Sequence, residues 1–201
     1  MISEIRVPKQ KRSIEKYEKI VDSGWLLFSK NGYYNTNTAD IAAHANVSTG
    51  IVYQYFKDKH DILIAGINKY GDDIFFPILK MDIDNFDINN FSEIATNMIN
   101  KYIKEHKISA AAHEEIMSMV HADKMVAKYY YEREMNLTNQ IYNMLINNNI
   151  NSDNLKEKVH IIVGLIDNLC HEIVYHKHEG LNYDSMMQIV IKNISNLIKD
   201  Y

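Results

Sequence analysis

Polar and basic side chains gather in a short stretch near the end of the first third of the chain, from Thr49 to Lys59. If this stretch is helical, Thr49, Tyr53 and Gln54 face outward and Tyr55 flanks them. Their hydroxyl and amide groups can hydrogen-bond base edges or phosphates, and Gln pairs well with adenine. Lys57 and Lys59 follow at once and could neutralise phosphates. Side chains of these types, in this order, favour contact with a double helix.

Two short helices joined by a tight turn would place these side chains. Thr38 can cap the first helix and Ser48 the second, while Asn46 tolerates the left-handed conformation that ends the first. Gly50 is small where two helices must cross closely. The inner faces would consist of Ile41, Ala42, Ala45, Ile51, Val52 and Phe56, with Val47 between the helices. This pattern predicts a helix–turn–helix, although such motifs also serve as plain packing units.

The same stretch resembles the tetracycline-repressor (TetR) family of bacterial transcription regulators. The resemblance spans about residues 14–65, and upstream it includes Ile20–Phe28 and the Gly32–Tyr33 turn. Asn46 stands where the family usually has Gly, and Tyr55 where His is common. The matching positions are Thr38, Ile41, Ala42, Ala45, Val47, Ser48, Gly50, Tyr53, Tyr55, Phe56, Lys59 and Leu63.

The resemblance implies a role for each matching polar residue. Thr38 would cap the helix over 38–45, which is the second helix of the domain, and would touch phosphate. Thr49 and Gln54 would face bases. Tyr53 and Tyr55 would lie at the groove edge, and Lys59 would contact the DNA backbone. A basic arm could add contacts or be a solvated tail; it contains Arg6, Lys9, Lys11 and Arg12.

Helical periodicity runs through nearly the whole chain, and no segment shows the alternation of a strand. Ser13 can cap the first helix, and Asn90 with Glu93 can cap a later one. We expect an all-α fold of about nine helices: 13–31, 38–45, 48–56, 61–76, 90–107, 109–121, 123–148, 153–178 and 184–200.

Charge divides the chain into a basic and an acidic part. Residues 1–60 contain nine Lys/Arg and six Asp/Glu, whereas residues 61–201 contain thirteen and twenty. A basic end on an acidic body favours contact of that end with a polyanion. We therefore predict a DNA-binding domain over 1–60 and an effector-binding and dimerisation domain over 61–201.

The last two helices carry apolar residues at a period close to 3.5, which suits long, nearly parallel helix packing. Two such hairpins can form a four-helix bundle across a two-fold axis, although the stripe could equally be buried inside one chain. The predicted dimer seam is Leu155, Val159, Ile162, Ile166, Leu169, Ile173, Met187, Val190, Ile194 and Leu197.

The middle helices are where the resemblance places an effector pocket. Met and Tyr suit an adaptable apolar cavity with a few polar groups. The candidate lining residues are Met98, Tyr102, His113, Met117, His121, Tyr130, Glu134, Asp167 and His171, each of which could instead be an ordinary core or surface residue.

Metal binding and catalysis have less support in the sequence. The run HEIVYHKHEG misses the H-E-x-x-H pattern by one residue, and its His171–His176 spacing turns the two rings off a common face. There is no glycine-rich phosphate loop and no G-x-S-x-G elbow. We expect no metal site, no cofactor and no catalytic residue.

Cysteine content and hydropathy indicate the cellular compartment that we expect for this protein. Cys170 is alone, so no intrachain disulfide can form, and no apolar run is long enough to span a membrane. We expect a cytoplasmic, homodimeric regulator that binds a near-palindromic DNA operator and is released by an unidentified small molecule. The alternatives are a helical small-molecule-binding protein without DNA readout and an all-α metal-dependent enzyme.

Overall fold

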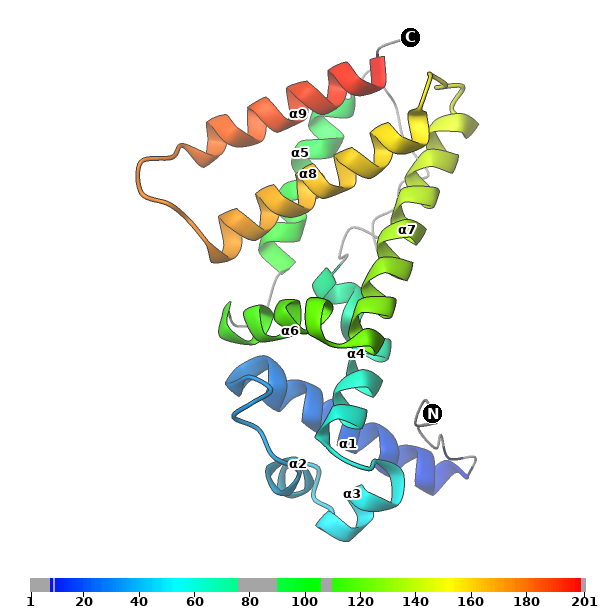
Figure 1. The fold of residues 1–201 in the computed structure, drawn as a ribbon, viewed down its shortest axis with the longest axis vertical. Helices are drawn as coiled ribbons and strands as arrows, with labels where there is room; N and C mark the ends of the chain where they lie inside the picture. Colours follow the sequence, from blue (N-terminus) through cyan, green and yellow to red (C-terminus); the bar gives the residue numbers. More distant parts are fainter. Residues whose placement is uncertain (1–7, 9, 76–89, 106–109, 200–201) are drawn as a thin grey trace. The chain divides into compact units, whose positions relative to one another are not determined.

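The fold is all-α. The computed structural model describes residues 8, 10–75, 90–105 and 110–199 of the chain, and within these ranges no strand is present. No helix in these ranges is long and apolar enough to cross a membrane. Nine helices lie within these described ranges, which confirms the expected fold (Figure 1). The helices are α1 (Lys11–Asn31), α2 (Thr38–His44), α3 (Thr49–Tyr55), α4 (Lys59–Phe75), α5 (Phe91–Glu105), α6 (Ala110–Ala122), α7 (Lys124–Asn147), α8 (Leu155–Tyr175) and α9 (Tyr183–Lys199).

The helices form two compact units. The first comprises residues 1–74 and 108–130, and the second comprises residues 75–107 and 131–201, so α7 contributes to both. This division differs from the predicted boundary at residue 60. α6 packs on α1, and Asp22 of α1 accepts the Lys69 ammonium of α4, so α4 and α6 belong to the first unit. A Cβ on Gly24 of α1 would lie only 2.4 Å from Ile62 Cγ2 of α4, so the two helices approach closely there.

Several helix ends are as the sequence indicates, and two are not. Gly32 ends α1 with φ 86°, and Asn46 takes the left-handed conformation with φ 54° after α2. Ser13 does not cap α1, because the helix begins at Lys11 and the Ser13 amide already donates to Gln10 O. Thr38 does not cap α2 either, because the Asn37 side chain accepts the amides of Ala39 and Asp40. At α2 the capping side chain is thus one residue nearer the amino terminus than predicted, and at α1 no side chain caps the helix.

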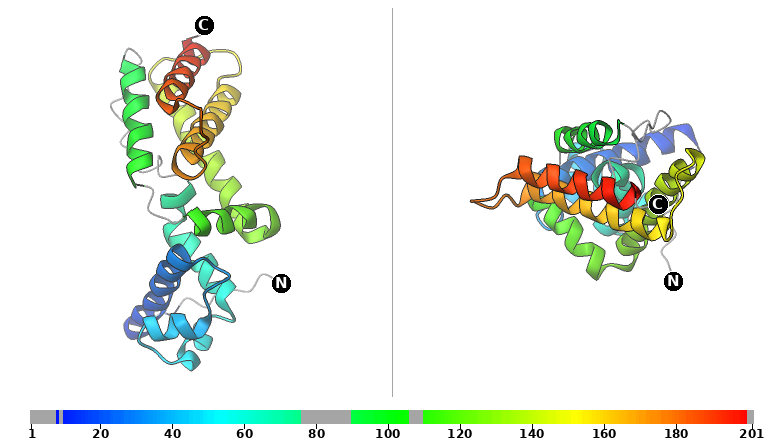
Figure 2. Two further views of the ribbon diagram at one scale, coloured as in Figure 1. Left: turned by 90° about the vertical axis from the view of Figure 1, so that its left-hand side faces the viewer. Right: turned by 90° about the horizontal axis from the view of Figure 1, so that it is seen from above.

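In the second unit, α8 and α9 form an antiparallel pair, and α5 packs on both (Figures 1 and 2). The connection between them contains Gly180, whose φ is 87°. Two apolar clusters form the core of this unit. One gathers around Leu145, Val159 and Ile194, and the other around Ile99, Leu169 and Ile191.

About half of the predicted dimer seam of α8 and α9 lies in the core of a single chain, and a role of the remaining residues in a dimer stays a prediction. Leu155, Val159, Ile162 and Ile194 are buried in the first cluster and Leu169 in the second, within a single chain. Partly buried members of the stripe pack on the same clusters: Ile166, Ile173, Met187, Val190 and Leu197. A period of 3.5 shows which face of a helix is covered and not which element covers it.

Candidate nucleic-acid interface

A tight turn joins α2 to α3. The amides of Ala45, Asn46 and Val47 donate to carbonyls within α2, which ends that helix cleanly. Ser48 then caps α3, as the sequence predicts, by accepting the Ile51 amide at 3.3 Å. Val52 is 0% exposed and Phe56 1% exposed, so one side of α3 is fixed in the core of the first unit.

The opposite side of α3 lies in solvent. Thr49, Gln54 and Tyr53 are exposed, the last by 58%. Lys57, just after the helix, is exposed as well. The outward orientation predicted for these side chains is confirmed, while their contact with DNA stays a prediction. The surface offers hydroxyl, amide and ammonium groups, which can bind both base edges and phosphates.

Two tyrosines of α3 have partners within the first unit. The Tyr53 hydroxyl lies 3.0 Å from the Thr38 hydroxyl at the start of α2, so this hydrogen bond ties the two short helices together at their exposed side. Tyr55 is half-buried and meets the Tyr17 ring of α1 edge-on, with centroids 6.2 Å apart. Tyr53 is therefore more accessible than Tyr55. The partner ring of Tyr55 is itself partly covered, and burial raises the pKa of Tyr17.

Gly50 does not serve the close helix crossing that the sequence predicts. It is exposed, and a Cβ built there would meet only Ser48 Oγ, at an ordinary 3.8 Å. Ala42, in contrast, is buried in α2. The missing side chain at Gly50 instead leaves open space at the start of α3, where an approaching surface can come near the backbone.

Lys59 has contacts within the protein, and its predicted contact with the DNA backbone stays a prediction. Its ammonium donates to Tyr33 O at 2.8 Å and to Thr36 O at 2.9 Å, and lies 4.3 Å from the centre of the Tyr33 ring. These contacts join the start of α4 to the loop between α1 and α2. An ammonium has three donor hydrogens, so most of its capacity is used inside the protein.

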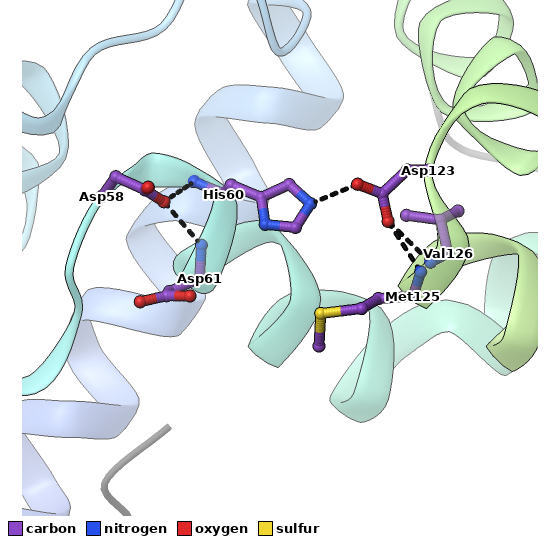
Figure 3. Close-up of polar contacts among 6 residues, drawn as sticks. All are labelled: Asp58, His60, Asp61, Asp123, Met125 and Val126. Atoms are coloured by element: carbon purple, nitrogen blue, oxygen red, sulfur yellow. Dashed lines mark hydrogen bonds and ion pairs between the residues drawn. The ribbon is translucent and has the colours of Figure 1, made fainter. Parts of the chain in front are cut away.

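Three contacts that the sequence does not reveal hold this domain together. Glu115 of α6 accepts the amides of Tyr33 and Tyr34 in the loop between α1 and α2. His60 at the start of α4 contacts Asp123, which precedes α7, at 2.8 Å (Figure 3). Asp22 of α1 accepts the Lys69 ammonium and the Tyr70 hydroxyl of α4. Each pair is separated by more than forty residues, and no local pattern could have indicated it.

A group of possible metal ligands lies at the start of α4, away from the histidines considered above. Within the described residues, Asp58, His60 and Asp61 each offer an atom within 4.8 Å of the others. Asp58 Oδ1 accepts the amides of His60 and Asp61 (Figure 3). Asp61 Oδ2 accepts the Lys57 amide. Capping of the first turn of α4 accounts for both carboxylates.

The candidate effector residues are divided between the two units. His113, Met117, His121 and Tyr130 belong to the first unit, with His113 buried and His121 exposed. Glu134, Asp167 and His171 belong to the second. The side chains of Met98 and Tyr102 lie outside the described part of the structure. The prediction of a single pocket from these nine residues therefore stays a prediction.

Asp167 is an unusual acid within the second unit. Burial raises its pKa to about 7, and the negative charge of Glu134 on α7 adds to the rise. His171 Nδ1 lies 3.4 Å from Asp167 Oδ2, one turn along α8. Burial, followed by the charge of Asp167, also raises the pKa of Cys170 to about 12, so this thiol is not a reactive thiolate.

Fold and site together define an all-α protein with an amino-terminal helix–turn–helix domain. Residues 20–65 match the family model described as bacterial regulatory proteins, tetR family. This match assigns the amino-terminal helix–turn–helix domain of the chain to the tetR family of regulatory proteins.

Similar proteins agree with this assignment. The HTH-type transcriptional regulator HbdR of Aromatoleum sp. (strain CIB) is 51% identical over 58 residues, which are 29% of this chain and 25% of HbdR. The chain thus matches only about a quarter of this relative's length. IcaR of Staphylococcus aureus (strain Newman), a negative transcriptional regulator of the biofilm operon icaADBC, is 23% identical over 64% of this chain and 77% of its own. A transcriptional regulator of Saccharomonospora viridis, solved in complex with choline, shares the fold with a TM-score of 0.63, 17% identity and coverage of 90% and 95%.

The contacts of Lys59 predict a loss of stability when its ammonium is removed. We expect Lys59→Met to lower the free energy of unfolding by about 1.5–3 kcal/mol, because the side chain loses charge-assisted hydrogen bonds to two carbonyls. Lys57→Met, at an exposed position nearby, should change it by less than about 0.5 kcal/mol. Urea unfolding followed by circular dichroism measures both. Equal stability of the two variants would return Lys59 to the set of candidate phosphate ligands.

Proposed function

We propose that the protein is a DNA-binding transcriptional regulator, and specifically a repressor. In this proposal α3 enters the major groove, and Thr49 and Gln54 contact base edges. Thr38, Ser48, Gly50, Tyr53, Tyr55 and Lys57 would lie at the groove edge or near phosphates. The negative regulator IcaR, matched over much of this chain, supports repression over activation. Such a regulator would act where the DNA is, in the cytoplasm.

The exposure of α3 is the observation on which this proposal rests. A helix–turn–helix that served only as a packing unit would cover its second helix with another part of the protein. Here Tyr53 and Gln54 of α3 are exposed, whereas Val52 and Phe56 are fully packed. The arrangement therefore favours DNA readout over a helical ligand-binding protein or a metal-dependent enzyme.

We also propose that a second copy of the chain binds the outer side of α8 and α9. With the inner stripe buried, the exposed apolar residues of these helices are Ile161 at 56%, Leu165 at 38% and Ile189 at 59%. Ile161 and Leu165 lie one turn apart on α8, with the exposed Gly164 between them. The missing side chain at Gly164 allows another helix to approach closely, and the two larger residues beside it offer apolar contact. A dimer would offer two α3 helices to a near-palindromic operator.

A small-molecule effector would release the operator by binding the helices beyond α4. The choline complex of the fold relative from S. viridis supports a ligand-binding role for this part of the fold. Asp167, Glu134 and His171 are candidates for its polar contacts within the second unit. In this mechanism α4 moves with the ligand-bound state and changes the separation of the two α3 helices. The effector must bind that state more tightly than the DNA-bound state, because only differential affinity shifts the equilibrium.

Operator binding is tested with duplexes that the full-length protein selects from a random library. We expect Gln54→Ala to weaken binding to the selected duplex by about 1–3 kcal/mol and to relax its sequence preference at one position. Lys57→Ala should lower the slope of log K against log salt concentration by about 1, since one phosphate contact is lost. Fluorescence anisotropy over a salt series measures both. Failure of the wild-type protein to enrich any sequence would reject the proposal.

Dimerisation through the outer side of α8 predicts a specific disruption. We expect Leu165→Asp to raise the dimer dissociation constant by at least about 100-fold, because a carboxylate would be buried against an apolar partner. Leu26→Asp changes an exposed apolar residue of α1 and serves as the matched control. Sedimentation equilibrium reports the oligomeric state of each variant. A Leu165→Asp protein that dimerises like the control would place the interface elsewhere.

Effector coupling predicts that compounds which bind the full chain also change its DNA affinity. Compounds found by thermal-shift screening, with choline included, should weaken binding to the selected duplex by about fivefold or more. Anisotropy titrations with and without each compound provide the measurement. Compounds shown by calorimetry to bind the protein, yet all without effect on DNA affinity, would contradict the mechanism.

A further inference from the structure

The loop that leads into the helix–turn–helix lies between two opposite charges. Glu115 of α6 accepts the amides of Tyr33 and Tyr34, the second at 3.2 Å. On the other side, the Lys59 ammonium binds the carbonyls of Tyr33 and Thr36. The peptide groups of this loop are thus bound from both sides by side chains of α6 and α4. Their orientation is fixed by charge-assisted hydrogen bonds, which are stronger than neutral ones.

The backbone beside this loop is shaped to receive the carboxylate. Gly32 has φ 86°, a conformation that side chains rarely adopt. A Cβ on Gly32 would lie 2.7 Å from Glu115 Oε1 and 2.8 Å from Oε2. The absence of a side chain at Gly32 therefore allows the carboxylate to reach the two amides. α1 and α6 also pack directly on each other.

A second carboxylate binds the segment that leaves the helix–turn–helix. Asp123 Oδ2 lies 2.8 Å from His60 Nε2, and Asp123 Oδ1 accepts the amides of Met125 and Val126 at the start of α7 (Figure 3). Partial burial opposes ionisation, but the amides of Val126 and Met125, together with His60, lower the pKa of Asp123. Asp123 is therefore a carboxylate that joins the first turn of α4 to the corner between α6 and α7.

These two carboxylates flank the reading motif without belonging to its exposed face. Glu115 contacts the chain just before Asn37, which caps α2, and Asp123 contacts it just after Phe56. All of these residues lie in the first unit. The segment from Glu115 to Asp123, which we call the α6–α7 corner, therefore forms hydrogen bonds to the chain both before and after the helix–turn–helix.

We propose that Glu115 and Asp123 are positioning residues for DNA recognition, which act by orienting the helix–turn–helix and not by touching DNA. This inference rests on the DNA-binding function proposed above. It makes the α6–α7 corner part of the DNA-reading head, although the corner lies more than fifty residues beyond α3 in the sequence.

The test compares affinity, salt dependence and folding of full-length variants on the duplex selected by the wild-type protein. Glu115→Ala should weaken binding about tenfold, and Glu115→Gln less, since the amide oxygen still accepts a hydrogen bond. Asp123→Asn keeps a side chain that can cap α7 and should also weaken binding. The salt slope should equal that of the wild type for all three, because no phosphate contact is lost. Glu179→Ala, at an exposed position between α8 and α9, removes the same charge and should bind normally.

Each outcome separates the inference from the function on which it rests. Circular dichroism at the assay temperature shows that a variant is folded, and Glu115→Gln and Asp123→Asn serve if Glu115→Ala does not fold. Wild-type affinity in the folded Glu115 and Asp123 variants would overturn the positioning role while leaving DNA binding intact. A changed salt slope would also overturn it, since it would indicate a direct electrostatic effect on DNA. If the wild-type protein selects no duplex, both proposals fail.

Discussion

Burial of one side of α3 is the constraint on which the reading surface depends. A seven-residue helix is too short to be stable alone in water. Val52 and Phe56 anchor it in the core of the first unit, and the Ser48 cap fixes its first turn. Each fully buried aliphatic or aromatic side chain contributes about 1.5–3 kcal/mol. With that side fixed, the exposed position of Thr49 and Gln54 follows from helical geometry alone.

Polar contacts between residues far apart in the sequence then fix the position of the helix–turn–helix relative to α1, α4 and α6. Glu115 accepts amides and Lys59 donates to carbonyls of the loop before α2, and Asp22 joins α1 to Lys69 and Tyr70 of α4. Apolar packing by itself tolerates small rotations of a helix, whereas hydrogen bonds to charged groups are directional. The first unit therefore combines an apolar core with a polar frame, and it extends well past the helix–turn–helix into α6 and the beginning of α7.

The helices α8 and α9 use their two sides differently. The residues of their regular apolar stripe pack in the core of the second unit, against α5 and the end of α7. Fewer apolar residues remain outside, among them Ile161 and Ile189. Interfaces need only a few well-placed anchors surrounded by polar residues. The sparse outer side is therefore compatible with association, while the dense inner stripe is required for the chain to fold.

The sequence by itself determined the helical class, the nine helices, the turn at Asn46, the cap at Ser48 and the outward side of α3, because each of these follows from local periodicity, capping and backbone preference. It misjudged what packs against what. The sequence predicts that the stripe of α8 and α9 meets another chain and that Lys59 meets phosphate, whereas much of the stripe is core and the Lys59 ammonium binds backbone carbonyls of the same chain. The contacts of Glu115 and Asp123 were not foreseen at all. Only the tertiary structure decided these partners, since a periodic pattern identifies a buried face or a charged group but contains no information on the distant residue that comes to lie beside it.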